Sequence, residues 1–488
     1  MFGMSAFLSS AVSAETNGPN TVASLDTDFY AYVNAGENLD ATFTKAGGIP
    51  VGLDDTVITL SRPGTPDESC TIPVAALNGF ACTFADRTAP TDGIWRLSLK
   101  PNEGHVFTWS INAQTGTTDI PGRVWTEQYT LTQIETPLGI DFTYWYQDKS
   151  GYLYETTYRD YNGLLSILGA SSIGLVESGG GCTPLYKSVN MTDTDFAIAP
   201  SNCQSYFKLF FVSPAADLPA SALKWDGSSE WVKPPITPPV VSNLNFVSAT
   251  ADSRTGSLDF DVGTYTGLLF VDVDTNNNGV YTDPVDVTLK HTAIISSNSV
   301  PFNGLDGNGD PIANDQAISF RVRIDRQAEI HFLNQDVERR NGGIEVQRLN
   351  GPLAGRNTIF WDDTRFANPD PNRCSVTSTS NGTLGVDSLG GVHSWTNAVP
   401  PCTNFGSANN GINGSWGDYR IINDWTYASS DVSATYLLAG ASSSPVTPTA
   451  PNTGVGSDSG IATLMAMVAG ILVSAVGIVW TTRVRFSK

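Results

Sequence analysis

Residues 29–43 read Phe29-Tyr30-Ala31-Tyr32-Val33-Asn34-Ala35-Gly36-Glu37-Asn38-Leu39-Asp40-Ala41-Thr42-Phe43. The run after the Gly36 turn has an apolar residue at every second position, a period typical of a strand with one buried face. Similar short runs follow at 57–60, 71–74 and 94–99, each bounded by Gly, Pro or Asp. Short strands at this spacing predict an all-β protein built from tandem β-sandwich domains.

The composition supports this class and excludes one kind of partner. The chain has 488 residues, 27 Lys and Arg against 48 Asp and Glu, and a net charge of -21. Nucleic acid is not an expected partner, because its phosphates need a basic surface. Few charged residues with abundant Gly, Ser, Thr and aromatics indicate a secreted β-protein.

The proline-rich stretch from Pro234 to Pro239 marks a boundary, because prolines cannot join a strand ladder and favour an extended spacer. A second signal is the turn Phe302-Asn303-Gly304-Leu305-Asp306-Gly307-Asn308-Gly309-Asp310-Pro311, which resembles a turn of bacterial Ig-like modules. The resemblance implies an Ig-like fold there and no activity. We therefore expect β-sandwich domain 1 at 21–100, an aromatic-rich β domain 2 at 101–232, a linker at 233–239, an Ig-like β-sandwich domain 3 at 240–334 and a C-terminal β domain 4 at 335–438.

Both ends of the chain carry targeting features. Residues 1–14 are short, apolar and small, like the remnant of a secretory signal peptide; the alternative is an N-terminus without fixed structure. Residues 439–459 form a Ser/Thr/Pro stalk, residues 460–480 are apolar and long enough for a transmembrane helix, and residues 481–488 are a basic tail. Cations only after the span predict that this tail is cytoplasmic and the rest extracellular.

A short motif stands in the stalk: Ala450, Pro451, Asn452, Thr453 and Gly454. Followed by an apolar span and terminal cations, it resembles the cell-wall sorting signal of Gram-positive-type surface proteins, with Ala450 where the family usually has Leu. The resemblance implies cleavage between Thr453 and Gly454 by a sortase-type transpeptidase and attachment of Thr453 to the cell envelope. The alternative is a stalk that continues into a permanent membrane anchor.

Six cysteines fall into three local couples, Cys70 with Cys82, Cys182 with Cys203 and Cys374 with Cys402. In an exported chain an even count predicts disulfides. Of the fifteen possible pairings we favour the sequential one, because each couple lies within one expected domain. Cys70 and Cys82 are expected to staple one hairpin. No C-x-x-C motif occurs and the four histidines are scattered, so a zinc site is not expected.

The segment 272–286 carries a candidate calcium loop. With Asp274, Asn276 and Asn278 at loop positions one, three and five, Gly279 falls at the sharp turn of position six, as in D-x-[DN]-x-[DN]-G loops. Val285 occupies position twelve, so a neighbouring carboxylate would have to replace the usual Glu. The candidate ligands of Ca²⁺ are Asp272, Asp274, Asn276, Asn278, Asp283 and Asp286. The alternative is a hairpin turn that needs no metal.

Aromatic residues are the candidate ligand platform. In Tyr144-Trp145-Tyr146 successive rings must point to opposite faces of a strand, so at least one lies on the outer face unless both faces are covered. Exposed rings, including Trp395 and Trp416 in the C-terminal Gly/Trp segments, could bind a sugar or a protein. Packing in the core explains the same aromatics without a ligand, and we favour that explanation.

Catalytic motifs are lacking, and we do not expect an enzyme. The sequence has no G-x-S-x-G, no H-E-x-x-H and no phosphate-binding glycine loop. Asp362 and Asp363 are a poor glycosidase pair, because adjacent strand residues face opposite sides. A surface-anchored structural or adhesive protein is the leading hypothesis, a carbohydrate-binding surface protein is second, and a wall-anchored hydrolase is a distant third.

Overall fold

The structure is a computed structural model that describes most of the chain before residue 442. The described residues are 15–16, 21–22, 26–47, 54–101, 105–133, 139–163, 166–179, 181–203, 206–236, 239–263, 265, 267–324, 326–337, 339–351, 354–366, 382–395, 420–428 and 435–441. The expected signal peptide, Cys374, Cys402, Trp416, the sorting motif, the membrane span and the basic tail lie outside them. In the described ranges, no helix is long and apolar enough to cross a membrane.

The prediction of an all-β fold is confirmed for the described residues, where helix is limited to the 3-10 turn η1 (Thr364–Phe366). The largest sheet has nine strands, paired antiparallel throughout. In spatial order it contains β29 (Arg339–Arg348), β14 (Leu153–Asn162), β13 (Ile140–Gln147), β19 (Lys208–Phe210), β11 (Val124–Thr126), β3 (Thr27–Val33), β8 (Gly93–Lys100), β5 (Thr56–Arg62) and β6 (Thr65–Ile72).

Two further sheets pack against the nine-stranded sheet. The five-stranded sheet contains β1 (Glu15–Thr16), β9 (Val106–Thr115), β4 (Asn38–Gly47) and β7 (Ala81–Thr88), with β10 (Thr118–Ile120) on β9. The eight-stranded sheet contains β2 (Thr21–Val22), β12 (Gln128–Gln133), β15 (Ser166–Ser171), β28 (Gln327–Gln335), β32 (Arg420–Ala428), β30 (Thr358–Trp361) and β31 (Val386–Asp387), with β17 (Val189–Asn190) on β32.

These sheets cross the expected domain divisions. The nine-stranded sheet takes strands from expected domains 1, 2 and 4, because β29 pairs with β14 and β11 pairs with β3. The eight-stranded sheet likewise joins β15 of expected domain 2 to β28 and β32. The divisions after residues 100 and 334 are therefore not divisions between sheets. Alternation within one strand marks its buried face but not its partner, which is why the sequence did not reveal this sharing.

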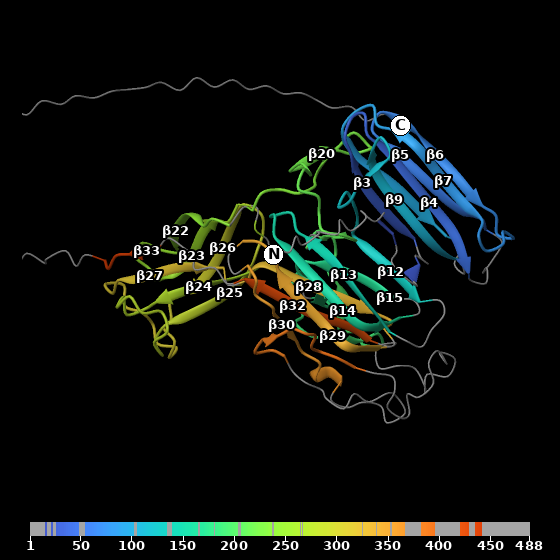
Figure 1. The fold of residues 1–488 in the computed structure, drawn as a ribbon. Coiled ribbons are helices and arrows are strands. Elements are labelled where there is room, and N and C mark those ends of the chain that lie inside the picture. The colour runs from blue at the N-terminus through green and yellow to red at the C-terminus, as the bar shows by residue number, and fades with distance from the viewer. Residues whose placement is uncertain are drawn as a thin grey trace, which may run out of the picture. The chain divides into compact units, whose positions relative to one another are not determined.

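Figure 1 shows the arrangement of the three sheets, and one continuous core of buried side chains joins them. At one end Phe29 of β3 packs on Trp109 of β9, with ring centroids 4.7 Å apart. At the other end Tyr146 of β13 packs on Phe332 of β28, at 5.2 Å. Burying each large side chain contributes about 1.5–3 kcal/mol, so this aromatic core is the main stabilising layer. The turn around Gly36, with φ of 82°, leads from β3 in one sheet to β4 in another.

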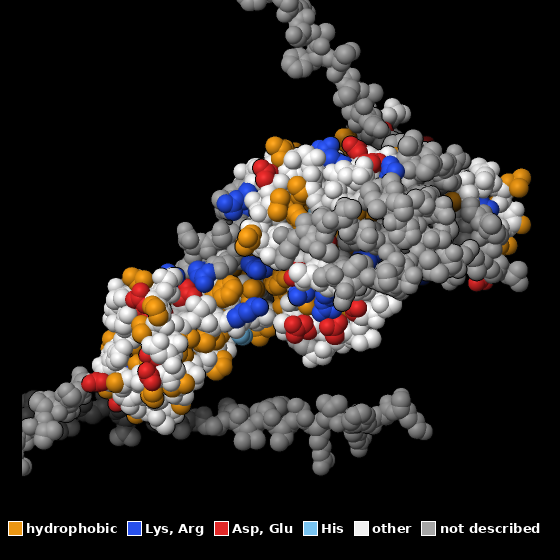
Figure 2. Space-filling model, turned by 90° about the horizontal axis from the view of Figure 1, so that it is seen from below, with side chains coloured by type: hydrophobic (Ala, Val, Ile, Leu, Met, Phe, Trp, Pro, Cys, Tyr) orange, Lys and Arg blue, Asp and Glu red, His pale blue; other side chains and the backbone are white. Residues whose placement is uncertain are grey.

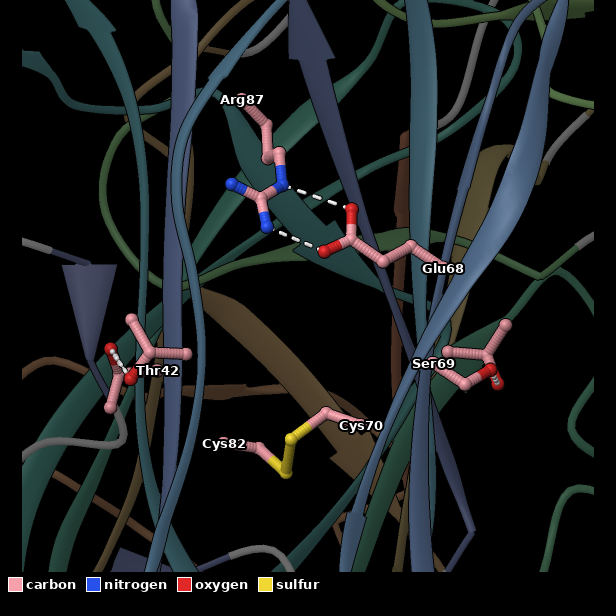
Figure 3. The surroundings of a disulfide bond; sticks show 8 residues. Thr42, Glu68, Ser69, Cys70, Cys82 and Arg87 are labelled. Atoms are coloured by element: carbon pink, nitrogen blue, oxygen red, sulfur yellow. Dashed lines mark hydrogen bonds and ion pairs between the residues drawn. A yellow bond between two sulfur atoms is a disulfide. The ribbon is translucent and has the colours of Figure 1, made fainter.

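The Cys70–Cys82 disulfide is present as predicted, with its Cα atoms 5.8 Å apart. The expectation that it staples one hairpin is wrong: Cys70 lies on β6, the edge of the nine-stranded sheet, and Cys82 on β7, the edge of the five-stranded sheet. It therefore joins two sheets that face each other. Beside it, Arg87 of β7 donates two hydrogen bonds to Glu68 of β6, at 2.9 and 2.5 Å (Figure 3).

The Cys182–Cys203 disulfide is also present as predicted, with its Cα atoms 5.3 Å apart. It lies beside a small two-stranded sheet, β16 (Leu175–Glu177) with β18 (Phe196–Ile198). A second two-stranded sheet pairs β20 (Ser221–Leu223) with β21 (Ser229–Trp231). Both small sheets pack on the large ones: Leu175 of β16 contacts the eight-stranded sheet, and Ala222 of β20 contacts the nine-stranded sheet.

Expected domain 3 forms two facing sheets with their own core. One contains β22 (Ser242–Ser248), β23 (Thr255–Asp261) and β26 (Ser297–Asn303); the other contains β25 (Val287–Ala293), β24 (Gly267–Asp274), β27 (Ile318–Arg323) and β33 (Thr435–Leu438). The strand after Arg323 is β28, which pairs with β15 instead, and β33 of expected domain 4 supplies an edge strand. Phe302 of the predicted turn is buried in this core.

Candidate functional site

The predicted calcium loop follows the end of β24. Asp274 is fully buried, and its carboxylate accepts backbone hydrogen bonds from Asn278 at 3.2 Å and Gly279 at 2.8 Å. Gly279 has φ of 85°, a left-handed conformation that favours glycine. The tight turn therefore occurs at the position that the motif predicts.

The remaining polar groups of this loop bond to one another. The side-chain amides of Asn276 and Asn278 donate to Asp283 at 3.2 and 2.7 Å, which lowers the pKa of Asp283. Asp286 accepts the N–H groups of Thr275 at 3.1 Å and Asp283 at 2.8 Å. In the part of the chain that the structure describes, no group of three or more His, Cys, Asp or Glu side chains is placed to hold a metal ion. The polar groups of this turn form hydrogen bonds with one another. Its carboxylate and amide oxygens are also of the types that bind Ca²⁺.

Asp272 is separated from that loop by its own ion pairs. It lies on the outward face of β24, and both Arg321 and Arg323 of the neighbouring strand β27 donate to its Oδ2 at 2.9 Å. Thr288 donates to the other oxygen at 2.9 Å. Burial alone would raise the pKa of Asp272, but the two guanidinium groups outweigh it and the pKa is lowered. This carboxylate is thus engaged by arginines rather than by the loop.

The candidate aromatics divide as strand alternation predicts. Tyr144 and Tyr146 are buried in the main core, so the core interpretation is confirmed for both. Trp145 faces the opposite side of β13, half-buried, and its indole N–H donates to Glu155 at 3.0 Å. Trp395 is buried under the cation of Arg340, 4.4 Å from its ring centroid. Of these four rings, only Trp145 is on an outer surface.

Trp145 belongs to a row of side chains that crosses the outer face of the nine-stranded sheet. Cross-strand register pairs Trp145 with Phe210, Phe210 with Trp125, Trp125 with Tyr30, and Tyr30 with Arg96. The segment 215–232 packs on the centre of this row, with Leu218 and Val232 buried there. The row therefore forms a second, smaller core on the outer face, with polar residues beyond its edge.

A buried cluster of charges was not predicted from the sequence. It consists of Arg340 on β29, Asp363 just after β30, His393 in the loop after β31 and Asp424 on β32, each at most 8% exposed. Arg340 donates to Asp424 at 2.8 Å and to the backbone oxygen of His393 at 3.0 Å. The His393 ring bonds Asp424 at 2.5 Å through Nδ1 and Asp363 at 2.7 Å through Nε2, while Trp361 stacks on it at 4.6 Å.

The cluster holds the histidine as a cation. Burial opposes its charge, but Asp363 and Asp424 outweigh this and raise the pKa of His393 to about 9. Burial would raise the pKa of Asp424, yet Arg340 and His393 lower it. Both ring nitrogens donate to carboxylates, so the ring lacks the free lone pair of a general base. The arrangement fits a structural role, in which the buried charges hold together β29, the end of β30 and β32.

The sequence signal for this cluster was weak. In the sequence, His393 follows Gly390 and Gly391 closely, but nothing near it in the chain points to Arg340 or Asp424. In the structure its φ is 53°, which is unusual for a residue with a side chain. Asp362, the neighbour of Asp363, lies 3.7 Å from Lys187. The two residues follow the end of β30 and so are not strand neighbours as expected, and they have different partners, Lys187 for Asp362 and His393 for Asp363.

Comparison with models of known protein families and with curated proteins finds no match to this chain.

Proposed function

We propose that the chain is a secreted protein displayed at a bacterial envelope by its C-terminal segment, where it has a structural or adhesive role. The observation that carries this proposal is the Cys70–Cys82 disulfide, which joins the edges of two sheets. Disulfides of this kind persist in oxidising, extracellular compartments. The second disulfide, Cys182–Cys203, supports the same location.

The C-terminal features supply the means of attachment in this proposal. Ala450 to Gly454, the apolar residues 460–480 and the final cations resemble a sorting signal, so a sortase-type transpeptidase and the cell envelope are the proposed partners. Cleavage after Thr453 would join the extracellular part to an envelope amine. Mixed charges on the visible face in Figure 2, with acidic and basic side chains interspersed, suit an exposed and soluble surface.

Calcium binding by the loop 274–286 is part of the proposal as a stabilising cofactor. Asp274 and Gly279 have the turn geometry of positions one and six. Weak affinity, about 10⁻⁴ to 10⁻³ M, is typical of extracellular modules.

Carbohydrate binding is the second candidate function. It is favoured by the polar residues at the end of the aromatic row on the outer face of the nine-stranded sheet, where Tyr30 is paired with Arg96. Tyr144, Tyr146 and Trp395 do not favour it, because they are buried. Hydrolysis is not proposed, since Asp362 and Asp363 are engaged by Lys187 and His393.

Fractionation of cells that express the full chain tests the attachment. Wild-type protein should be released from the envelope only by a wall-degrading enzyme, and Thr453→Ala should shift it to the detergent-extractable membrane fraction. Thr449→Ala, in the same stalk but outside the motif, is the matched control and should behave as wild type. If Thr453→Ala changes neither fractionation nor mass, the sorting proposal is wrong.

A further inference from the structure

A polar groove of ≈ 330 Å³ lies on the outer face of the nine-stranded sheet, beyond the aromatic row. Its size is at the lower end of the roughly 300–1,000 Å³ usual for ligand sites. Strands β3, β5 and β8 and the residues that flank them form it, with a lining that includes Asp26, Asp28, Thr59, Arg96, Ser98 and Lys100. Register places Asp28, Ser98 and Thr59 in one row directly across the three strands. The groove is therefore built on paired strands, which hold its side chains at fixed spacing.

The charged side chains of the groove have no ion-pair partner among the described residues. In the described ranges, neither Arg96 nor Lys100 forms an ion pair, and no side chain donates a hydrogen bond to the carboxylates of Asp26 or Asp28. Elsewhere most cations are paired, as Arg87 is with Glu68 and Arg123 is with Asp217. Two available cations beside two available carboxylates, in a chain of net charge -21, make a locally neutral site with both donors and acceptors.

Arg96 is held in place by the aromatic row. Its guanidinium lies 4.8 Å from the ring centroid of Trp225, and Trp225 stacks on Tyr30 at 5.6 Å. Arg96 donates a hydrogen bond from Nη2 to the Ser61 hydroxyl at 3.4 Å. The buried Nε of Arg96 has no hydrogen-bond partner among the described residues. A flat guanidinium with free N–H groups matches the two oxygens of a carboxylate, and the stack reduces the entropy lost on binding.

The lining selects among anionic ligands. A carboxylate adds a single negative charge beside Asp26 and Asp28, whereas a multiply charged phosphate adds more and is repelled more strongly by them. The acids and the hydroxyls of Thr59 and Ser98 complement groups that both donate and accept, such as the hydroxyls of a sugar. We propose that this groove binds a saccharide that carries a carboxylate, with the carboxylate on Arg96 and Lys100 and ring hydroxyls on Asp28, Ser98 and Thr59. The inference deepens the proposed adhesive role, on which it rests for its biological setting.

Titration of the purified full-length chain in mild detergent tests this inference by calorimetry. Two acidic probes separate the possible sources: 3′-sialyllactose, with lactose as its neutral match, and trigalacturonic acid, with maltotriose as its neutral match. At least one acidic probe should bind about tenfold or more tightly than its neutral match, the difference expected for one charge-assisted contact. Raising the salt concentration should weaken that binding.

Variants locate the binding in the groove. Lys100→Gln and Arg96→Gln should each weaken the acidic probe about tenfold or more. Lys100 is exposed, so its substitution leaves the fold intact even if Arg96→Gln disturbs the Trp225 stack. Lys290→Gln, an exposed cation on β25, is the matched control and should bind as wild type.

The inference is overturned if neither acidic probe binds more tightly than its neutral match, or if Lys100→Gln binds as wild type. Because binding is measured on purified protein, this failure is distinguishable from a failure of envelope attachment, which the Thr453→Ala fractionation reports.

Discussion

Asp424→Asn is expected to destabilise the protein strongly, because Asp424 is the shared counter-ion of the buried charge cluster. Its side chain is 0% exposed and lies 2.8 Å from Arg340 and 2.5 Å from His393. An asparagine has nearly the same shape but no charge. Its side-chain NH₂ group is a donor and would meet the N–H donors of Arg340 or His393. Arg340 and His393 would then be buried with only Asp363 to balance them.

The expected loss of unfolding free energy is about 3–5 kcal/mol, the usual cost of removing one partner from a buried ion pair. This is a large part of a typical total of about 5–15 kcal/mol. Urea unfolding followed by tryptophan fluorescence measures it, and Trp361, stacked on His393 at 4.6 Å, is one of the eleven tryptophans that contribute to the signal. Hydrogen exchange should also rise in β29 and β32, which the cluster joins.

Asp195→Asn is the matched control, since Asp195 is an exposed carboxylate that pairs with Arg365 at 2.7 Å. Its substitution should leave the urea midpoint unchanged, because exposed ion pairs contribute little. A loss below about 1 kcal/mol for Asp424→Asn would refute the reasoning, since the cluster would then be no stronger than a surface pair.

Four further predictions follow from the same contacts. Raising the pH should destabilise the wild type. The pKa of His393 in the folded state is about 9, above the ordinary 6.5. Protonated His393 therefore contributes about 3 kcal/mol to the free energy of unfolding below pH 6.5, and this contribution is lost as the pH rises through 9. His393→Gln should reduce this dependence in urea unfolding at graded pH, and the buried Glu15 carboxyl, whose pKa burial raises to about 8, accounts for part of what is left. Replacing Cys70 and Cys82 together with Ser should cost about 3 kcal/mol for a loop of 12 residues, and an unchanged midpoint without reductant would contradict it. Asp272→Asn should cost about 1–3 kcal/mol, because it removes the buried negative charge that Arg321 and Arg323 share and leaves only a neutral amide oxygen as their acceptor; the shift in urea midpoint measures the loss. Calcium at 10 mM should raise the wild-type melting temperature by an amount equivalent to about 1.4–2.7 kcal/mol, given a dissociation constant of about 10⁻³ to 10⁻⁴ M, but leave Asp274→Asn unchanged; equal responses would argue against the loop.

Local sequence predicted the elements better than their partners. The alternation at Leu39–Phe43 correctly placed Leu39, Ala41 and Phe43 in the core. The two observed disulfides matched the sequential pairing, because each couple lies close along the chain. The sheet to which a strand belongs was not predictable, since any antiparallel edge can pair with any other of suitable register.

The candidate sites show the same division. The Asp274–Gly279 turn could be predicted because its hydrogen bonds join residues at most five positions apart. The His393 cluster could not, because Arg340 and Asp424 are 84 positions apart and only the pairing of strands brings them together. The polar groove is likewise produced by the register of β3, β8 and β5.

The sequence by itself determined the all-β class, the buried face of each strand, the local disulfides and the tight turns, because each depends on residues that are neighbours along the chain. Only the tertiary structure decided that one nine-stranded sheet spans three expected domains, that Cys70–Cys82 joins two sheets, and that an aspartate, a histidine and an arginine meet in the core. The physical reason is that these features arise from long-range strand pairing, whose free energy comes from the core that the sheets bury together.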